Sequence, residues 1–393
     1  MQTEVNLESL LMKWCPNGVK YFWIGELEDS KKISLGRGKV ISKKEIADNP
    51  GSYPVYSSSA TGDGEIGRYG QYMFDDIRLS RSIDGGGKFF YRDAPKYSIT
   101  NVSGWLEVVD KNFIEIKYLY YAMTNEWVKK SYDYTHKAHP SVIRKEYRIP
   151  LPPLPVQQEI VRILDHFTEL TAELTAELTA RRKQYVYYRD ALLTFGDRVE
   201  YKRIRDICKK ISSGGTPSTK HSEYYGGAIP WLRTQEVDWK DIYDTEIKIS
   251  EEGLANSAAK WIPSDCVIVA LYGATAAKVA INKIPLTTNQ ACCNLQIDEG
   301  IARVRYVFHW LSNEYVRLKS LGQGSQSNIS GETVKQYPIP VPSLDVQDRI
   351  ISLLDRFDTL CNNLTSGLPA EIATRQKQYA YYRDKLLTFK EMT

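Results

Sequence analysis

The stretch Tyr147-Arg-Ile-Pro-Leu-Pro-Pro-Leu-Pro-Val-Gln-Gln-Glu-Ile160 recurs 190 residues later as Tyr337-Pro-Ile-Pro-Val-Pro-Ser-Leu-Asp-Val-Gln-Asp-Arg-Ile350. A second motif, Lys-Gln-Tyr-x-Tyr-Tyr-Arg-Asp, occupies Lys183–Asp190 and returns 194 residues later at Lys377–Asp384. Both motifs occur in the same order in both copies. The 393-residue chain is therefore a tandem repeat of one unit, a large block followed by a long helix.

A long helix is expected after each copy of the first motif. Apolar side chains recur at spacings of 4, 3, 4, 3 and 4 residues over Val156–Leu174, which is the pattern of a coiled-coil seam. The second copy continues a similar pattern over Val346–Leu386. A helix of about forty residues, at about 1.5 Å per residue, would be about 60 Å long. The two helices are expected to pair antiparallel. Gly367 and Pro369 predict a kink or short break in the second.

The first helix contains a tandem tetrad, Thr171-Ala-Glu-Leu174 and Thr175-Ala-Glu-Leu178. One tetrad changes the length of a helix by about 6 Å and turns it by a little over one turn, and a coiled coil absorbs such an insertion without losing its seam. The repeat is therefore interpreted as a device that sets a distance. A chance low-complexity stretch is the alternative.

Leucines and tyrosines continue the heptad along both helices. The tyrosines could instead stack on nucleic-acid bases, but their spacing favours packing between helices together with a surface for partner proteins. The residues assigned to this spacer and partner surface are Leu170, Leu174, Leu178, Tyr185, Tyr188, Tyr379 and Tyr382.

The two large blocks share a frame but differ in content. Thr100-Asn101 matches Thr288-Asn289 at an offset of 188, whereas the sequences between such anchors diverge. One fold reading two different targets would give this pattern, and so would neutral drift after duplication. Both blocks favour strands and turns, with a buried strand expected at Val267–Tyr272 and helices near 113–130 and 301–319. The fold class is predicted to be α+β, with two pseudo-repeated α/β domains separated by two long antiparallel coiled-coil helices.

Composition indicates an ordinary globular protein with 42% apolar and 25% charged residues and a net charge of +4. No apolar run approaches the roughly 18–20 residues that span a membrane, and the start of the chain lacks the basic region of a signal peptide. The six cysteines show no CxxC pair, which fits reduced thiols and a cytoplasmic location.

Catalytic motifs are missing from the sequence. It has no Walker A sequence, no dinucleotide-binding glycine loop and no Asn-Pro-Pro-aromatic or Asp-Pro-Pro-aromatic methyltransferase motif. His136 and His139 have a His-x-x-His spacing, but no third ligand completes a metal set. Cys292 and Cys293 are expected to pack in the core. No catalytic residue, metal site or cofactor is therefore assigned to this chain.

Several segments together resemble the specificity subunit of type I restriction-modification systems, and they cover essentially the whole chain. In the first block, Ser57–Gly62 and Ile83–Lys88 depart from the pattern of the second, which makes the fold of that block less secure. The segments that carry the resemblance are Ser213-Gly-Gly-Thr-Pro-Ser-Thr-Lys220, Gly227-Ala-Ile-Pro-Trp-Leu-Arg-Thr-Gln-Glu236, Leu271-Tyr-Gly-Ala-Thr-Ala-Ala-Lys-Val-Ala280, Thr288-Asn-Gln290, the tandem tetrads and the two Lys-Gln-Tyr-x-Tyr-Tyr-Arg-Asp motifs.

The resemblance implies a division into target recognition domain 1 (1–150), a central spacer helix (151–196), target recognition domain 2 (197–341) and a C-terminal spacer helix (342–393). Each recognition domain would read one half of a bipartite site in double-stranded DNA, and the helices would fix the gap between the halves. The helices would also dock two methyltransferase (modification) subunits, and through them the restriction and translocase subunits. S-adenosylmethionine, ATP and magnesium are expected in those partners.

DNA contact requires Lys or Arg at phosphates and side chains that form paired hydrogen bonds with base edges. Solvent-facing loops that hold both types of residue are therefore the candidates. Each candidate could also be an ordinary solvated residue. The loops at 136–139 and 323–328 occupy the same position in the repeat and are the favoured base readers. The candidates are Arg68, Tyr69, Arg78, Arg81, Lys88, Arg92, Lys96, His136, Lys137 and His139 in the first block, and Ser218, Lys220, Arg233, Thr234, Gln235, Lys278, Gln323, Ser325 and Gln326 in the second.

Two other functions remain open at this stage. A coiled-coil scaffold that never touches DNA would share the helical repeat, and a catalytic DNA methyltransferase or nuclease would share the DNA-binding residues. The missing catalytic motifs disfavour the enzyme.

Overall fold

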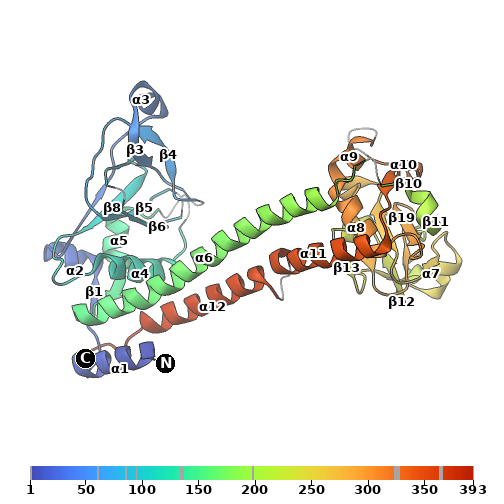
Figure 1. Cartoon of the computed structure of the whole chain (residues 1–393). Coiled ribbons are helices and arrows are strands. Elements are labelled where there is room, and N and C mark those ends of the chain that lie inside the picture. Colours follow the sequence, from blue (N-terminus) through green and yellow to red (C-terminus); the bar gives the residue numbers. More distant parts are fainter. Residues whose placement is uncertain are drawn as a thin grey trace. The chain divides into compact units, whose positions relative to one another are not determined.

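The computed structural model describes residues 2–59, 62–84, 86–93, 95–132, 137–196, 199–322, 328–362 and 366–392, with the side chains of 2–6 left aside. The chain forms two compact units. The first comprises Met1–Thr175 and Glu371–Thr393, and the second comprises Ala176–Ala370. Each unit contains one sheet-bearing domain and segments of the long helices (Figure 1).

The domain of the first unit contains a four-stranded antiparallel sheet and a three-stranded mixed sheet. Helices α2 (Ile24–Asp29), α4 (Ile116–Trp127) and α5 (Pro140–Glu146) pack on the strands of the domain, and α3 (Lys43–Asp48) lies by the smaller sheet. The sheets have the orders β2 (Ile33–Arg37), β8 (Ser103–Val108), β5 (Arg78–Ser82), β6 (Phe89–Arg92), and β4 (Glu65–Tyr69), β3 (Pro50–Tyr56), β7 (Ser98–Ile99), while β1 (Tyr21–Trp23) pairs with β9 (Arg148–Pro150).

The domain of the second unit has the same plan with added edge strands. Its helices are α7 (Glu251–Ala255), α8 (Val304–Asn313), α9 (Tyr315–Ser320) and α10 (Gly331–Gln336), with short 3₁₀ helices η1 (Ile204–Ile207), η2 (Ser222–Tyr224), η3 (Thr234–Glu236) and η4 (Gly273–Thr275). Its sheets have the orders β11 (Cys208–Ser213), β19 (Cys292–Ile297), β16 (Val267–Ala270), β17 (Val279–Asn282), β13 (Asp241–Ile242), and β14 (Lys248–Ile249), β12 (Tyr225–Leu232), β18 (Leu286–Thr288), β15 (Trp261–Ile262), while β10 (Tyr201–Arg203) pairs with β20 (Pro338–Pro340).

The predicted pseudo-repeat of the two domains is confirmed. The order β2-β8-β5-β6 corresponds to β11-β19-β16-β17, and the parallel pair β3–β7 corresponds to β12–β18. The expected buried strand is β16, and Cys292 and Cys293 pack in the core as expected, each with no more than 1% of its surface exposed. The sequence divergence at Ser57–Gly62 and Ile83–Lys88 therefore leaves the strand order of the first domain unchanged.

The first long helix is continuous, whereas the second is divided. Helix α6 runs for 39 residues, Leu154–Leu192, and contributes to both units. The second consists of α11 (Leu344–Asn362) and α12 (Leu368–Leu386). The break predicted from Gly367 and Pro369 is thus confirmed. Gly367 has a left-handed φ of 82°, which favours glycine, and Pro369 lies in the first turn of α12, where proline is tolerated.

Antiparallel pairing of the helices is visible within each unit. In the second unit, Tyr188 of α6 stacks on Phe357 of α11 with ring centroids 5.6 Å apart, and Arg182 donates to the carbonyl of Cys361. In the first unit, Phe167 of α6 stacks on Tyr382 of α12 at 5.2 Å, and the two helices lie side by side there (Figure 1). The four tyrosines at 185, 188, 379 and 382 all pack against apolar neighbours on the helices or domains.

The end of the chain joins the first unit. Val19 and Glu391 form a parallel bridge, in which the Val19 amide donates to the Lys390 carbonyl and the Met392 amide donates to the Val19 carbonyl. The hydroxyl of Tyr21 also donates to the Phe389 carbonyl at 3.1 Å. The segments before β1 and after α12 therefore lie side by side.

A buried glutamine connects each domain to its long helix. The side-chain amide of Gln157, at the start of α6, donates to the carbonyls of Phe113 and Pro152, while its oxygen accepts from the Glu115 amide. Gln347, at the start of α11, makes the equivalent bonds to Ile301, Pro342 and Arg303. Both side chains are fully buried, and each satisfies three backbone groups that are themselves buried or part-buried.

An aspartate two turns further along each helix adds a second connection. Asp165 of α6 accepts from the Lys117 ammonium and the Tyr121 hydroxyl, both at 2.6 Å. Asp355 of α11 pairs in the same way with Arg305 and His309, both at 2.7 Å. Residues eight apart lie on one face of a helix. The glutamine therefore contacts the segment just before α4 or α8, and the aspartate contacts side chains of that same helix.

The glutamine connection gives a stability prediction. Gln157→Leu is expected to lower the free energy of unfolding by about 1–3 kcal/mol or more, because the buried Pro152 carbonyl and two part-buried backbone groups lose their partner. Gln347→Leu should act similarly on the second unit. Chemical denaturation measures both.

Gln158→Leu is the matched control, because Gln158 is the exposed neighbour on the same helix. If Gln157→Leu were no more destabilising than Gln158→Leu, the glutamine connection would not hold the domain.

Candidate nucleic-acid interface

Four strands of the second domain end at one edge of its sheets. β11 and β16 both run antiparallel to β19, with Ser213 opposite Cys293 and Ala270 opposite Cys292. β12 runs parallel to β18, with Leu232 opposite Thr288. The loops that leave these ends are bonded to one another, because the Asn289 amide donates to the Leu232 carbonyl at 3.0 Å and the Leu271 amide to the Ala291 carbonyl at 2.8 Å. We call this edge the carboxyl edge.

Polar side chains of the predicted set gather on the carboxyl edge of the second domain. Thr234 lies in η3, and its carbonyl accepts from Thr275 of η4 at 2.8 Å. Gln235 beside it is exposed. The Gly273 amide donates to the side chain of Asn328 at 3.1 Å. The structure therefore brings the Arg233–Gln235 segment, η4 and the end of the 323–328 loop to one place.

Two of the predicted cations at this edge are already paired with exposed carboxylates. Arg233 contacts Glu246 at 3.0 Å, and Lys278 contacts Asp238 at 2.7 Å and lies 4.3 Å from the centroid of the Trp239 ring. Surface ion pairs of this kind contribute little, about 0–1 kcal/mol. A DNA phosphate can therefore displace either carboxylate at small cost.

Ser218 and Lys220 are exposed on the segment that follows β11. The hydroxyl of Tyr225 donates to the Pro217 carbonyl at 2.6 Å, and Thr216 bonds Gln290. The bond to Gln290 ties the start of the segment to the carboxyl edge, whereas the bond from Tyr225 holds Pro217 at the amino end of β12.

The first domain has the same edge. The Lys39 amide donates to the Ile99 carbonyl, the Thr100 amide to the Tyr56 carbonyl and the Ile83 amide to the Val102 carbonyl, each at 2.8–3.0 Å. A glycine after the first strand makes the closest approach in both domains. A Cβ on Gly38 would overlap the carbonyl of Ile99, and a Cβ on Gly214 would overlap that of Thr288.

Lys137 and His139 are the predicted residues that face solvent at the carboxyl edge of the first domain. Lys137 contacts Asp84 at 2.9 Å. The Nδ1 atom of His139 lies 3.0 Å from the Ser141 hydroxyl, at the start of α5. Lys88 is half-buried with its ammonium 4.9 Å from the centroid of the Phe90 ring.

Partial burial, followed by the positive charges of Arg37 and Arg81, holds the pKa of His139 below its usual range. The ring is therefore neutral at pH 7, and a neutral imidazole carries one donor and one acceptor. Because Nδ1 is engaged at Ser141, Nε2 is the ring atom that can contact a base edge.

Other predicted residues of the first domain lie at the opposite end of the sheets. Arg78, at the amino end of β5, contacts Asp76 at 2.7 Å and Glu107 at 3.0 Å. Lys96 precedes β7 and lies 4.5 Å from the centroid of the Tyr72 ring. Arg68 is exposed at the end of β4 and pairs with Glu65 in the same strand. The structure does not bring these three to the carboxyl edge.

Three of the expected surface residues are buried. Tyr69 is 5% exposed and its hydroxyl donates to Glu45, Arg81 is 1% exposed, and Arg92 is 5% exposed and bonds Ser80. The expectation that they lie on solvent-facing loops is therefore wrong, because all three belong to strands whose neighbours cover them. His136, Gln323, Ser325 and Gln326 lie outside the described residues.

Sequence reasoning missed several residues of the carboxyl edges. Arg37 and Lys39 in the first domain, and Tyr272 and Gln290 in the second, are exposed there. The repeated Thr-Asn pair at 100–101 and 288–289 was a usable signal, because both copies lie at this edge. It was interpreted only as an anchor of the repeat.

In the part of the chain that the structure describes, no group of three or more His, Cys, Asp or Glu side chains could hold a metal ion. No described helix is both long and apolar enough to cross a membrane.

Comparison with known proteins agrees with this architecture. A family model described as the type I restriction modification DNA specificity domain matches twice, at residues 16–181 and 196–374. The Escherichia coli type I restriction enzyme EcoR124I/EcoR124II specificity subunit is 39% identical over 296 residues, 71% of this chain and 72% of that protein. A putative type I specificity subunit of Mycoplasma pneumoniae, S.MpnORF507P, is 29% identical over 93% of this chain and 97% of its own length.

Solved structures show the same fold. A type I restriction-modification S subunit from M. genitalium superposes with a TM-score of 0.60 at 17% identity, covering 95% of this chain and 97% of that one. A chain from a study of complex assembly in the type I R-M system gives a TM-score of 0.59 at 14% identity, with 95% and 98% covered. With the family model matched in both halves, this chain belongs to the type I restriction-modification specificity subunits and contains two copies of the DNA specificity domain.

Proposed function

We propose that this chain is the non-catalytic subunit that selects the DNA site of a type I restriction-modification complex, with each carboxyl edge reading one half of a bipartite duplex site. One observation carries the proposal. The two domains place equivalent loops at equivalent edges but fill them with different side chains, such as the exposed His139 before α5 in the first and the exposed Ser330 before α10 in the second. Equivalent loops that carry different side chains are suited to the recognition of two different half-sites.

The side chains on the edges supply both kinds of DNA contact. Lys278 and Arg233 can exchange their surface carboxylates for phosphates, which position the protein on the duplex. Gln235 is exposed and can form the paired hydrogen bonds that select adenine. In the first domain, Arg37, Lys39 and Lys137 supply positive charge around His139.

The long helices are proposed to set the gap between the half-sites. Leu170, Leu174 and Leu178 are half-buried while the threonines and glutamates of the tetrads are largely exposed. Thr171 and Thr175 bond the carbonyls four residues earlier, at 2.8 and 2.7 Å. The tetrads therefore extend a regular helix without adding a packed surface, which suits a spacer.

Partner subunits are proposed to dock on the helices. Tyr187 and Tyr381 occupy the same position in the two repeated motifs and are 69% and 62% exposed. Their neighbours Tyr188 and Tyr382 pack inward. Two equivalent exposed aromatic side chains suit two copies of one partner, the methyltransferase subunit, which would bring S-adenosylmethionine and recruit the ATP- and magnesium-dependent restriction subunits.

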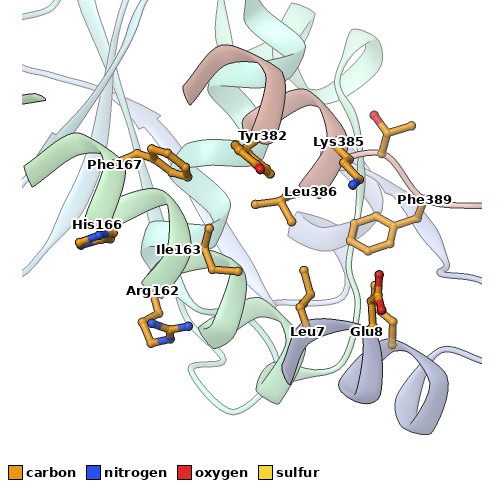
Figure 2. Close-up of a pocket in the computed structure, with 12 residues that line it drawn as sticks. Leu7, Glu8, Arg162, Ile163, His166, Phe167, Tyr382, Lys385, Leu386 and Phe389 are labelled. Carbon is orange, nitrogen blue, oxygen red and sulfur yellow. The ribbon is translucent and has the colours of Figure 1, made fainter. Parts of the chain in front are cut away.

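A cavity between helices of the first unit offers that partner a further contact. Side chains of α1 (Gln2–Trp14), α6 and α12 surround about 540 Å³ (Figure 2). Its apolar lining can take a side chain of the partner, and Arg162, Lys385 and Glu8 offer charges. The lining residues are Leu7, Glu8, Leu11, Arg162, Ile163, His166, Phe167, Tyr382, Lys385, Leu386, Thr388 and Phe389.

Base reading is tested by binding selection from a pool of randomised duplexes, with the full chain in complex with its methyltransferase subunits. Gln235→Ala is expected to relax the preference at one base pair, worth about 1–3 kcal/mol. Lys278→Ala should weaken binding to all sequences alike and reduce the slope of log affinity against log salt concentration by about one.

Gln158→Ala, on an exposed face of α6, is the control and should leave both measurements unchanged. A wild-type complex that selects no sequence at all would favour the scaffold function, and methyl transfer by this chain alone would favour the enzyme.

The spacer function predicts the effect of removing one tetrad. Deleting Thr175–Leu178 shortens α6 by about 6 Å and is expected to shorten the preferred gap by one or two base pairs, since duplex DNA rises about 3.4 Å per pair. The half-sites themselves should not change. Glu177→Gln, which keeps the helix length, should leave the gap as it was, and an unaltered gap in the deletion variant would rule out the spacer.

If partners dock on the helices, substitutions of adjacent tyrosines should have different effects, one on the affinity for the partner and the other on the melting temperature. Tyr187→Ala together with Tyr381→Ala is expected to lower the affinity for the methyltransferase subunit at least ten-fold without lowering the melting temperature. Tyr188→Ala should lower the melting temperature, because Tyr188 stacks on Phe357. Analytical ultracentrifugation of the mixtures measures how many subunits bind, and retention of two subunits by the double variant would contradict this surface.

A further inference from the structure

Among the described residues, a buried arginine of the first domain lacks part of the partners that burial normally demands. Arg81 lies in β5 and is 1% exposed. Its Nε atom donates to the Ala138 carbonyl at 3.1 Å. Within the described residues, Nη1 and Nη2 have no hydrogen-bond partner. Burial lowers the pKa of this guanidinium to about 10, and an incompletely paired buried charge is costly to the folded state.

The sheet is built to accommodate this side chain. In the strand register, Arg37 of β2 lies opposite Gly104 of β8, and Gly104 lies opposite Arg81. A Cβ on Gly104 would lie only 2.5 Å from the Arg81 Cζ atom. The guanidinium therefore occupies the space that a side chain at 104 would fill.

The second domain shows that the fold does not need a charge at this position. In the equivalent row, Ser213 of β11 lies opposite Cys293 of β19, which lies opposite Val269 of β16. Val269 and Cys293 are buried, with at most 1% exposed. An apolar pair thus fills the same place without an unmatched donor, so Arg81 serves something particular to the first domain.

The residue that Arg81 holds lies between two exposed residues of the carboxyl edge. Ala138 is fully buried, whereas Lys137 and His139 on either side are exposed. The His139 amide donates to the Lys137 carbonyl at 2.7 Å, and the His139 Nδ1 atom lies 3.0 Å from the Ser141 hydroxyl and 3.5 Å from the Ser141 amide, at the start of α5. In the tautomer in which Nδ1 accepts there, the ring proton is on Nε2, where it can donate to a base.

We propose that Arg81 is a positioning residue for DNA reading by the first domain, fixing the Lys137–His139 backbone from beneath through the Ala138 carbonyl. The inference rests on the proposed function of the carboxyl edge. Burial of the incompletely paired guanidinium costs stability, whereas its bond to the Ala138 carbonyl fixes the orientation of His139. Arg81 contacts no DNA itself.

Arg81→Met tests the role, because methionine fills similar space without a charge. The full chain in complex with its methyltransferase subunits is selected against a duplex pool randomised in both half-sites. The variant is expected to lose preference at least ten-fold in the half-site read by the first domain, keep the preference in the other half-site, and melt at the same or a higher temperature. A packing role alone would lower the melting temperature and leave the preference unchanged.

Four further measurements separate a positioning role of Arg81 from a packing role. His139→Ala should reproduce the lost preference, and the double variant should lose no more than either single one. The ring of His139, followed by NMR in the chain with labelled histidines, should titrate at higher pH in Arg81→Met, because one positive charge is removed. Lys111→Met removes an exposed charge before α4, at the end of β8 away from the carboxyl edge, and should change none of these.

Retention of the first half-site preference in either Arg81→Met or His139→Ala overturns the inference, whether or not Arg81→Met folds well. If the wild-type complex selects no sequence in either half, the proposed function fails, and that result is separate from the result for Arg81.

Discussion

A buried glutamine at the start of each long helix is the interaction on which the rest of the structure depends. Gln157 and Gln347 each satisfy three backbone groups of the adjoining domain. An aspartate eight residues later, Asp165 or Asp355, accepts two further bonds from the same domain. Because these residues belong to the helix, the orientation of each carboxyl edge follows the helix that carries it, and a domain that turned freely could not read a duplex in fixed register.

The repeat also explains how one fold would serve the two reading tasks proposed for it. Constant features hold the frame: the glutamine, the aspartate, and the glycine packed on Ile99 or Thr288 at the carboxyl edge. Variable features occupy the loops between them. Arg81 and Val269 show that the variation extends into the sheet beneath the edge, where one domain uses an apolar residue and the other tolerates a buried charge.

Local chemistry made much of this predictable from sequence. Heptad spacing predicts the helices, and Gly367 with Pro369 predicts the break between α11 and α12. The burial of Arg81 could not be predicted, because it depends on Gly104 in a neighbouring strand and hence on the strand register. The separation of Arg78 and Lys96 from Lys137 and His139 likewise depends on strand direction, which residue type does not encode. Gln157 and Gln347 stood within the repeated motif, but nothing in the sequence showed that their amides would be buried.

Selection of binding sites by the wild-type complex tests the central claim most directly. A randomised duplex pool, sequenced after selection, should yield two short blocks of preferred bases separated by a gap of fixed length without preference. A single continuous block, or no preferred sequence at all, would contradict the account of two carboxyl edges held apart by the helices.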